Sequence, residues 1–224
     1  MHCRTILIAL ILTASPVVAE PVPVIEGVAR ITDGDTLSIG PIIIRLNGID
    51  APEAGQSCRN KRGMDWGCGT EATNRLAELV GERAVQCHAL DRDAYGRIIG
   101  QCFSGEVDLG AALVSEGLAW AYIRYSDVYA GLETVAREAE LGIWSGANET
   151  PWDYRENRWE RAAAESPRPG CPIKGNISQA GERIYHTPWS PHYGRTRIDE
   201  DKGERWFCDE AEAVAAGWRA ARWR

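Results

Sequence analysis

The sequence lacks several features that define common classes of protein. It has no glycine-rich phosphate loop, no internal repeat and no paired CxxC motifs, so it carries no signature of a P-loop enzyme, a solenoid or a zinc ribbon. It also lacks a positive net charge, because 25 Lys and Arg stand against 32 Asp and Glu. Such an acidic chain repels nucleic acid at long range. This argues against a tight nucleic-acid binder, but less against an enzyme whose carboxylates hold metal ions.

The N-terminus carries no apolar run long enough to span a bilayer, which takes about 20 residues. The run from Ile6 to Leu12 follows Arg4 and precedes the small-residue ending Val17-Val18-Ala19. This order indicates a secretory signal peptide over residues 1–19, cut after Ala19; a buried N-terminal helix is the less favoured alternative. We therefore expect a periplasmic or secreted protein, a monomer with no membrane span.

Six cysteines follow the signal peptide, and an even number in an exported chain predicts disulfides. They are Cys58, Cys68, Cys87, Cys102, Cys171 and Cys208. If residues 93–96 form a four-residue turn, Arg92 faces Arg97 and Cys87 lies opposite Cys102, close enough for a bridge. Neighbourhood in the sequence suggests the pairs Cys58–Cys68 and Cys171–Cys208. A zinc site that adds His186 and His192 to the last pair is the less favoured alternative.

The hydrophobic pattern predicts strands and helices in a particular order. Residues 24–48 indicate three short strands broken at 32–35 and at Gly40-Pro41, and residues 84–89 and 97–103 indicate a hairpin. Helices are expected over 70–81, with Thr70 as N-cap, over 108–120, over 132–144 and, exposed, over 152–165. This order predicts an α+β fold, a five-stranded OB-fold barrel with about three helices.

The domain organisation follows from changes in composition along the chain. We expect a barrel domain over residues 20–150, a helix and linker over 151–170, and a small C-terminal α+β module over 171–224. The acidic charge is concentrated in the first part, where residues 20–150 carry 11 Lys and Arg against 20 Asp and Glu. No role is evident for the C-terminal module.

Carboxylates and arginines stand together in the pattern that phosphodiester cleavage requires. Carboxylates hold a hard metal ion, and the planar fork of arginine matches phosphate oxygens. The motifs are "DGDT" (33–36), "RLNGIDAPE" (45–53), "DAYGR" (93–97), "LVSEGLAWAY" (113–122) and "LGIW" (141–144). In this order and over residues 24–146, they make the chain resemble the staphylococcal-type thermonucleases.

The resemblance implies a role for each matched residue. Asp35, Asp50 and the backbone carbonyl of Ala51 would bind Ca²⁺ as cofactor, and Glu53 would orient or deprotonate the attacking water. The catalytic set is Arg45, Glu53 and Arg97, in which the two arginines would clamp the phosphoryl oxygens. The resemblance implies an endonuclease that cleaves DNA and RNA with little sequence preference and leaves 3'-phosphate ends.

Other polar residues near these motifs have weaker assignments. Tyr95 and Tyr122 match positions that contact substrate in the family, although packing on the barrel explains a tyrosine about as well. Asp33 is interpreted as a turn former. A strict two-residue turn at Gly40-Pro41 would pair Asp35 with Leu46 and turn Arg45 to the opposite face, so a longer turn or a bulge is expected there.

Two other functions are compatible with the sequence. One is a catalytically silent nucleic-acid-binding OB-fold protein, which would be expected to have lost part of the set Asp35, Arg45, Asp50, Glu53 and Arg97. The other is an envelope-binding protein that acts through the C-terminal module, whose exposed aromatic residues fit such a role.

Overall fold

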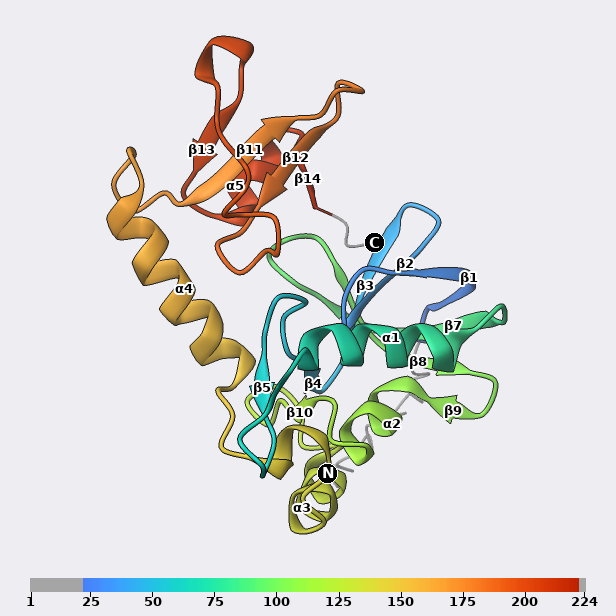
Figure 1. The fold of residues 1–224 in the computed structure, drawn as a ribbon. Helices are drawn as coiled ribbons and strands as arrows, with labels where there is room; N and C mark the ends of the chain where they lie inside the picture. Colours follow the sequence, from blue (N-terminus) through green and yellow to red (C-terminus); the bar gives the residue numbers. More distant parts are fainter. Residues whose placement is uncertain (1–21, 222–224) are drawn as a thin grey trace, which may run out of the picture.

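The computed structural model describes residues 22–221, and the predicted signal peptide lies outside the described residues. Among residues 22–221, no helix combines the length and the hydrophobicity needed to cross a membrane. A strand-built barrel lies below a smaller C-terminal module in Figure 1, and a long helix on one side connects the two.

Five strands form the closed barrel. They are β1 (Val24–Ile31), β2 (Thr36–Ile39), β3 (Ile42–Leu46), β7 (Ala84–Arg92) and β8 (Ile98–Ser104). Four antiparallel pairings run in the order β3-β2-β1-β7-β8, and a parallel pairing of β3 with β8 closes the ring. The core includes Leu37, Ile44 and Val85, and the last of these alternates with exposed neighbours along its strand. The predicted OB-fold barrel is therefore confirmed.

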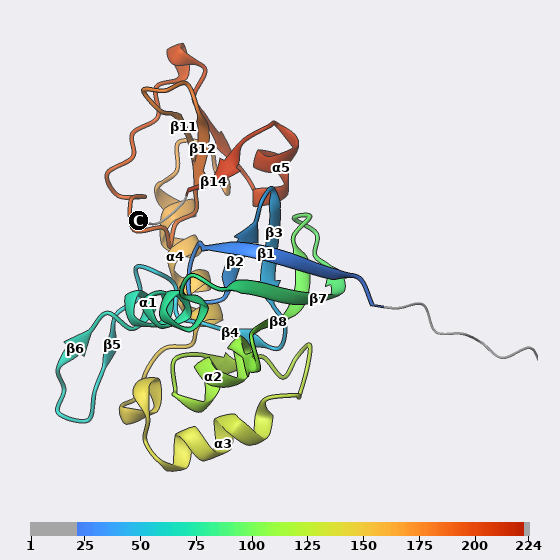
Figure 2. The same cartoon turned by 90° about the vertical axis from the view of Figure 1, so that its right-hand side faces the viewer.

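Short strands and helices cover the barrel and carry the connections. The strands are β4 (Ile49–Asp50), β5 (Cys58–Arg59), β6 (Asp65–Trp66), β9 (Val107–Asp108) and β10 (Trp120–Ala121). The helices are α1 (Cys68–Val80), α2 (Leu109–Ser115), α3 (Ala130–Glu138) and the 3-10 turn η1 (Gly142–Ser145). Figure 2 shows α1 beside the barrel, with α2 and α3 on the side opposite the C-terminal module.

The helix starts differ from the sequence predictions in one instructive place. Helix α1 begins at Cys68 after Gly67, so the prediction that Thr70 is its N-cap is wrong. Cys68 forms a disulfide with Cys58, and the N-cap lies three residues earlier than the capping pattern suggests. By contrast, Asp108 caps α2 by accepting a hydrogen bond from the Ala111 N–H, as an N-cap carboxylate does.

The β7–β8 hairpin contains the predicted disulfide, but its strands pair in a different register next to the turn. Arg92 pairs with Ile98 rather than with Arg97, so the turn is one residue longer than predicted. A bulge between Ala89 and Asp91 then removes the offset, and Cys87 does lie opposite Cys102 in a disulfide. The third predicted pair, Cys171 with Cys208, is also present, so these two cysteines are not available as zinc ligands.

The first hairpin contradicts the expectation of a long turn or bulge. Ile39 pairs with Ile42, so Gly40-Pro41 is a strict two-residue turn, and Gly40 adopts the positive φ of 57° that such a turn favours. The Leu46 N–H donates to the Asp35 carbonyl, as the strict register requires. Asp35 nevertheless meets Arg45, because Asp35 precedes β2 in a bend where the alternation of strand faces does not apply.

The C-terminal module is a small sheet with its own core. Helix α4 (Pro151–Glu165) leads to it, and its other elements are β11 (Ile173–Ile177), β12 (Arg183–His186), η2 (Glu200–Lys202), β13 (Arg205–Phe207), α5 (Glu210–Ala215) and β14 (Arg219–Ala220). The sheet order is β13-β11-β12-β14, and Phe207 packs against Trp218 in the core. Helix α4 is not simply exposed as predicted, because Tyr154 and Ala162 are buried.

A buried histidine makes the module sensitive to acid. Burial, reinforced by the charges of His192, Lys174 and Arg219, lowers the pKa of His186 to about 4 from its ordinary value of 6.5. Its Nε2 lies 2.9 Å from Asn176 Oδ1, an arrangement that fits a neutral ring donating to the amide oxygen. His186 therefore binds a proton more readily in the unfolded chain than in the folded one.

The expected result is a loss of stability as the pH falls through 6.5. The contribution of His186 is fully present above that pH and declines towards pH 4, by about 2 kcal/mol between pH 7 and pH 5. Denaturant unfolding at several pH values should show a smaller acid-side loss in His186→Gln than in the native protein. The matched change His88→Gln should keep the full loss, and equal losses in the native protein and His186→Gln would contradict the assignment.

Candidate active site

The site is built where the ends of several barrel strands meet. Asp35 precedes β2, Arg45 lies in β3, Asp50 ends β4, and Glu53 follows in the next loop. Asp50 is held in place by the pairing of β4 with β10, in which it lies opposite Trp120. Short connections therefore bring together three carboxylates that the sequence spreads over 19 positions.

Two glycines allow the backbone to approach closely enough for this arrangement. A Cβ atom on Gly69, in the first turn of α1, would lie 1.7 Å from the Glu53 carbonyl oxygen. A Cβ atom on Gly34, next to Asp35, would lie 2.8 Å from the Ala51 Cβ. Both contacts are too short for any larger residue, so α1 and the loop before β2 fix the two ends of the site.

Arg45 bridges the two innermost carboxylates. Its Nη1 donates to Asp35 Oδ1 at 3.1 Å, and its Nη2 lies 3.0 Å from Asp35 Oδ2 and 2.8 Å from Asp50 Oδ1. Asp50 is completely buried and Asp35 is 4% exposed, so these contacts are made almost out of water. The structure thus brings Arg45, Asp35 and Asp50 into direct contact.

The surroundings of Asp33 and Asp35 give these neighbouring carboxyls opposite pKa shifts. Burial alone would raise the pKa of Asp35, but the Arg45 guanidinium and the Ala51 N–H outweigh it, so the pKa lies below its usual value. Burial and the charge of Asp35 raise the pKa of Asp33 to about 7. Asp33 Oδ1 accepts from the Asp35 N–H at 3.1 Å, the local bond expected of a turn former.

Glu53 lies at the edge of this cluster. Its side chain is 18% exposed, and burial raises its pKa to about 8 against the opposing charge of Arg155. Its backbone is held by Gln56, whose side-chain oxygen accepts from the Glu53 N–H at 3.1 Å. A carboxyl with a pKa near neutral is suited to proton transfer.

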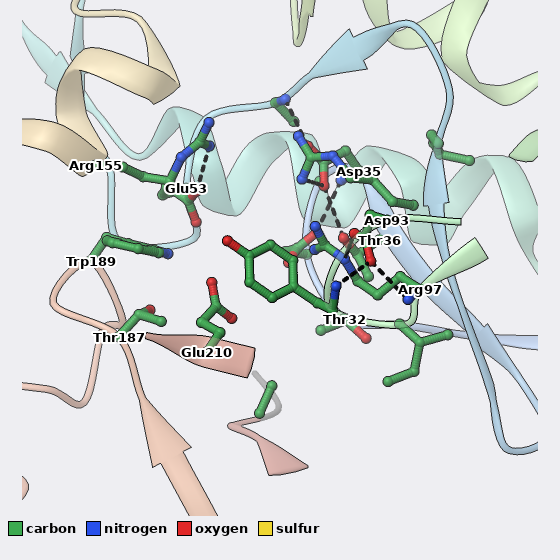
Figure 3. A pocket seen from close by; sticks show the side chains of 18 of the residues that line it. Thr32, Asp35, Thr36, Glu53, Asp93, Arg97, Arg155, Thr187, Trp189 and Glu210 are labelled. Carbon is green, nitrogen blue, oxygen red and sulfur yellow. Dashed lines mark hydrogen bonds and ion pairs between the residues drawn. The ribbon is translucent and has the colours of Figure 1, made fainter. Parts of the chain in front are cut away.

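Arg97 lies beside the acidic cluster and is held by contacts with other residues. Its Nε donates to Asp93 Oδ2 at 2.6 Å, and its guanidinium lies 5.5 Å from the ring centre of Tyr95. The pairing of Arg45 with Ile99 places the start of β8 next to β3, and the charge of Arg97 helps to lower the pKa of Asp35. Figure 3 shows Arg97 with Asp93 on the barrel side of the pocket.

The two tyrosines predicted to contact substrate both line the pocket, but in different settings. Tyr95 is 40% exposed in the β7–β8 turn. One face of Tyr122 is covered by Trp152 of α4, with ring centres 5.5 Å apart and an angle of 18° between the rings. Each ring therefore has a neighbour over one face, Trp152 on Tyr122 and the Arg97 guanidinium on Tyr95.

Arg155 is the site residue that sequence reasoning missed. It extends from α4, and its Nη2 lies 2.7 Å from Asp50 Oδ2 while its Nη1 lies 3.1 Å from Asp50 Oδ1. Its Nη1 also lies 2.8 Å from Glu53 Oε1, and Figure 3 shows Arg155 beside Glu53. No local pattern in the sequence distinguishes Arg155 from the other arginines of α4, which are exposed. Only the docking of α4 on the barrel reveals the contact.

The pocket lies between the barrel and the C-terminal module and has a volume of about 1080 Å³. Its barrel wall carries Asp35, Arg45, Glu53 and Arg97, whereas Asp50 is buried behind it. Its opposite wall includes Tyr185, Trp189 and Glu210, of which Trp189 and Glu210 face the barrel residues in Figure 3. The Tyr185 hydroxyl donates to Glu210 at 2.8 Å, which fixes this wall.

The carboxylates of the site are of the chemical kind that binds a hard divalent cation, but their oxygens now contact arginines instead. Two buried carboxylates and a third beside them are oxygen ligands of the kind that calcium prefers. Yet both Asp50 oxygens are bonded to guanidinium groups, and no group of three or more acidic, His or Cys residues within 22–221 is arranged to hold a metal ion. A cation at Asp50 would have to displace an arginine.

A barrel of this topology with paired carboxylates and arginines in one pocket defines a phosphodiester-hydrolase type of site. The family model described as staphylococcal nuclease homologue matches residues 43–146, and a second model, ArfC, matches residues 157–220. The chain belongs to the staphylococcal nuclease homologue family. The predicted resemblance and the predicted enzyme class, a hydrolytic nuclease, are confirmed.

The chain is similar to three bacterial proteins over most of their length. A succinoglycan biosynthesis protein ExoI of Rhizobium meliloti (strain 1021) is 35% identical over 171 residues, which are 74% of this chain and 84% of the relative. A micrococcal nuclease of Shigella flexneri is 36% identical, over 57% of this chain and 78% of the relative. An uncharacterized endonuclease of Escherichia coli is 32% identical, over 58% and 84%.

Proposed function

We propose that the protein is an exported, calcium-dependent endonuclease that hydrolyses phosphodiester bonds of DNA and RNA with little sequence preference and leaves 3'-phosphate ends. The observation that carries this proposal is the bridge that Arg45 makes between Asp35 and Asp50, with Glu53 and Arg97 lining the same pocket. The names of the micrococcal nuclease and the endonuclease relatives support the same activity. The three disulfides support an oxidising compartment such as the periplasm or the medium.

The side chains divide the proposed reaction among them. Arg45 and Arg97 bind the phosphoryl oxygens and offset the negative charge that develops on them. The ionised form of Glu53 accepts a proton from the water whose oxygen attacks phosphorus, and its raised pKa makes that form a stronger base than an ordinary carboxylate. The bond from phosphorus to the 5' oxygen breaks, and that oxygen takes up a proton, so a 3'-phosphate and a 5'-hydroxyl remain.

Calcium would bind at Asp35, Asp50 and the backbone carbonyl of Ala51. When bound, the ion supplies positive charge to a phosphoryl oxygen and makes a bound water more acidic. The donor set, with its buried carboxylates, supports this assignment.

We also propose that the chain is divided into a nuclease domain over 20–150, a helix and linker over 151–170, and a module over 171–224. The position of Tyr185, Trp189 and Glu210 on the pocket wall favours a module that shapes the substrate cleft over one that binds the envelope. We propose that the protein is a monomer.

The decisive experiment uses the full chain with its disulfides intact and a single-stranded DNA oligonucleotide. Cleavage is expected with calcium and not with a chelator, and the fragments should resist 3' extension until a phosphatase has treated them. Arg97→Ala should lower the rate constant of cleavage by about 10²–10³-fold, because it removes a charge that the transition state needs.

The matched control is Arg83→Ala, which removes an exposed arginine whose Nη2 donates to the Leu79 carbonyl, away from the pocket. Its activity should stay within about two-fold of the native protein. A silent nucleic-acid-binding protein would instead bind the oligonucleotide and leave it intact under every condition. DNA degraded equally by the native protein and Arg97→Ala would also reject the proposed mechanism.

A further inference from the structure

Arg155 lies outside both segments that match family models, between residue 146 and residue 157. It nevertheless makes closer contacts with the acidic cluster than Arg97 does. Its guanidinium holds both oxygens of Asp50 and one of Glu53, at 2.7 to 3.1 Å. The side chain is 23% exposed, and Asp50 is completely buried. A positive group therefore occupies the position where the carboxylates face one another.

The charges of the acidic cluster show what the Arg155 guanidinium does when no metal ion is bound. Asp35 and Asp50 would repel each other strongly in a buried site if no positive charge lay between them. Arg45 contacts Asp35 and one oxygen of Asp50, whereas Arg155 contacts both oxygens of Asp50 and one of Glu53. The second guanidinium thus completes the compensation that a divalent cation would otherwise provide.

The same contacts exclude a second cation from these oxygens. A calcium ion lies 2.3–2.6 Å from its oxygen ligands, and the nitrogens of Arg155 already lie 2.7 to 3.1 Å from the oxygens of Asp50 and Glu53. The ion and the guanidinium would compete for the same lone pairs and would repel each other at contact distance. Occupancy by one therefore requires the departure of the other.

The helix that carries Arg155 is firmly attached to the barrel. The Tyr154 hydroxyl donates to the Gly55 carbonyl at 3.2 Å, and Gln56 Nε2 donates to the Glu149 carbonyl at 2.8 Å. Trp152 stacks on Tyr122 in the first turn of α4. Moving α4 would break all these contacts, whereas rotation of the Arg155 side chain into the adjacent pocket breaks only its ion pairs.

We propose that Arg155 is a built-in competitor for the divalent cation, a residue that sets the calcium affinity of the site by occupying Asp50 and Glu53 until the ion displaces its side chain. This inference rests on the calcium site of the proposed function. Because the site accepts the ion only in the fraction of molecules from which Arg155 has departed, the apparent dissociation constant exceeds the intrinsic one by the inverse of that fraction.

The test measures calcium binding directly, by isothermal titration calorimetry with CaCl₂ on the full, oxidised chain after removal of metal by chelator. Arg155→Gln should bind calcium at least ten-fold more tightly than the native protein. Arg155→Lys keeps the charge without the two-pronged contact and should fall between them. The control Arg161→Gln makes the same charge change on α4, at an exposed arginine bonded to the Asn157 carbonyl, and should bind as the native protein does.

A second measurement needs no variant and so does not depend on the folding of Arg155→Gln. Phenylglyoxal modifies accessible arginines, and mass spectrometry of the native protein should show faster modification of Arg155 in calcium than in chelator, with Arg161 unchanged. Equal calcium affinity in Arg155→Gln and the native protein, or modification of Arg155 that ignores calcium, would overturn the competitor role and leave the calcium site intact. Absence of calcium binding in every variant would instead refute both the calcium site and the competitor.

Discussion

Glu53→Gln is expected to lower the kcat for DNA cleavage by about 10²–10⁴-fold, with a much smaller change in KM. The reason is chemical, since glutamine has nearly the shape of glutamate but cannot accept a proton from the attacking water. Glu53 also lines the pocket, and its raised pKa makes its ionised form a stronger base than an ordinary carboxylate. Its backbone contact with Gln56 does not involve the carboxyl and should survive the change.

Steady-state kinetics on a single-stranded oligonucleotide in calcium measure this effect. The matched control is Glu160→Gln, which removes an exposed carboxyl from helix α4, outside the pocket lining, and should keep its activity. A kcat for Glu53→Gln within ten-fold of the native value would exclude Glu53 as the base. A rise in KM with an unchanged kcat would assign it to substrate binding instead.

Asp50→Asn is expected to lower the free energy of unfolding of the metal-free protein by about 3–5 kcal/mol. Asp50 is completely buried and bonds to two guanidinium groups, those of Arg45 and Arg155. An amide can accept with only one of its two positions, so the substitution leaves positive charge without a partner in a buried site.

Urea unfolding in the presence of chelator measures the loss. Asp65→Asn is the matched control, because Asp65 pairs with Arg59 on the surface hairpin with its side chain 67% exposed, and about 1 kcal/mol or less should be lost there. A double-mutant cycle of Asp50→Asn with Arg155→Gln should show a coupling of at least 1 kcal/mol. A loss at Asp50 no larger than at Asp65 would refute the idea that the buried pairs stabilise the fold.

The parts of the fold that sequence reasoning predicted are those fixed by local patterns. Alternating Val and Ile residues with turn signals located the five barrel strands, and Asp108 located the start of α2. The errors lie where distant segments decide. The disulfide to Cys58 starts α1 before Thr70, and the bulge after Ala89 compensates for a turn that is longer than its residues suggest.

The candidate site divides in the same way. The matched motifs located Asp35, Arg45 and Asp50, and the structure brings these three into direct contact. The expectation of a bulge in the first hairpin was wrong, because strand alternation was applied to Asp35, which lies in a bend outside the strand. Arg97 is nearer to Asp93 than to the acidic cluster, a placement that the motif alone does not specify.

The sequence by itself determined the class of this protein, since the type and order of its charged motifs specify a nuclease barrel and since close pairs of cysteines specify two of its crosslinks. Only the tertiary structure decided which groups share the pocket. Helix α4 joins the barrel through contacts between residues about 100 positions apart, such as Tyr154 with Gly55, and no local pattern encodes such contacts. Arg155 reaches Asp50 and Glu53 only because helix α4 packs on the barrel.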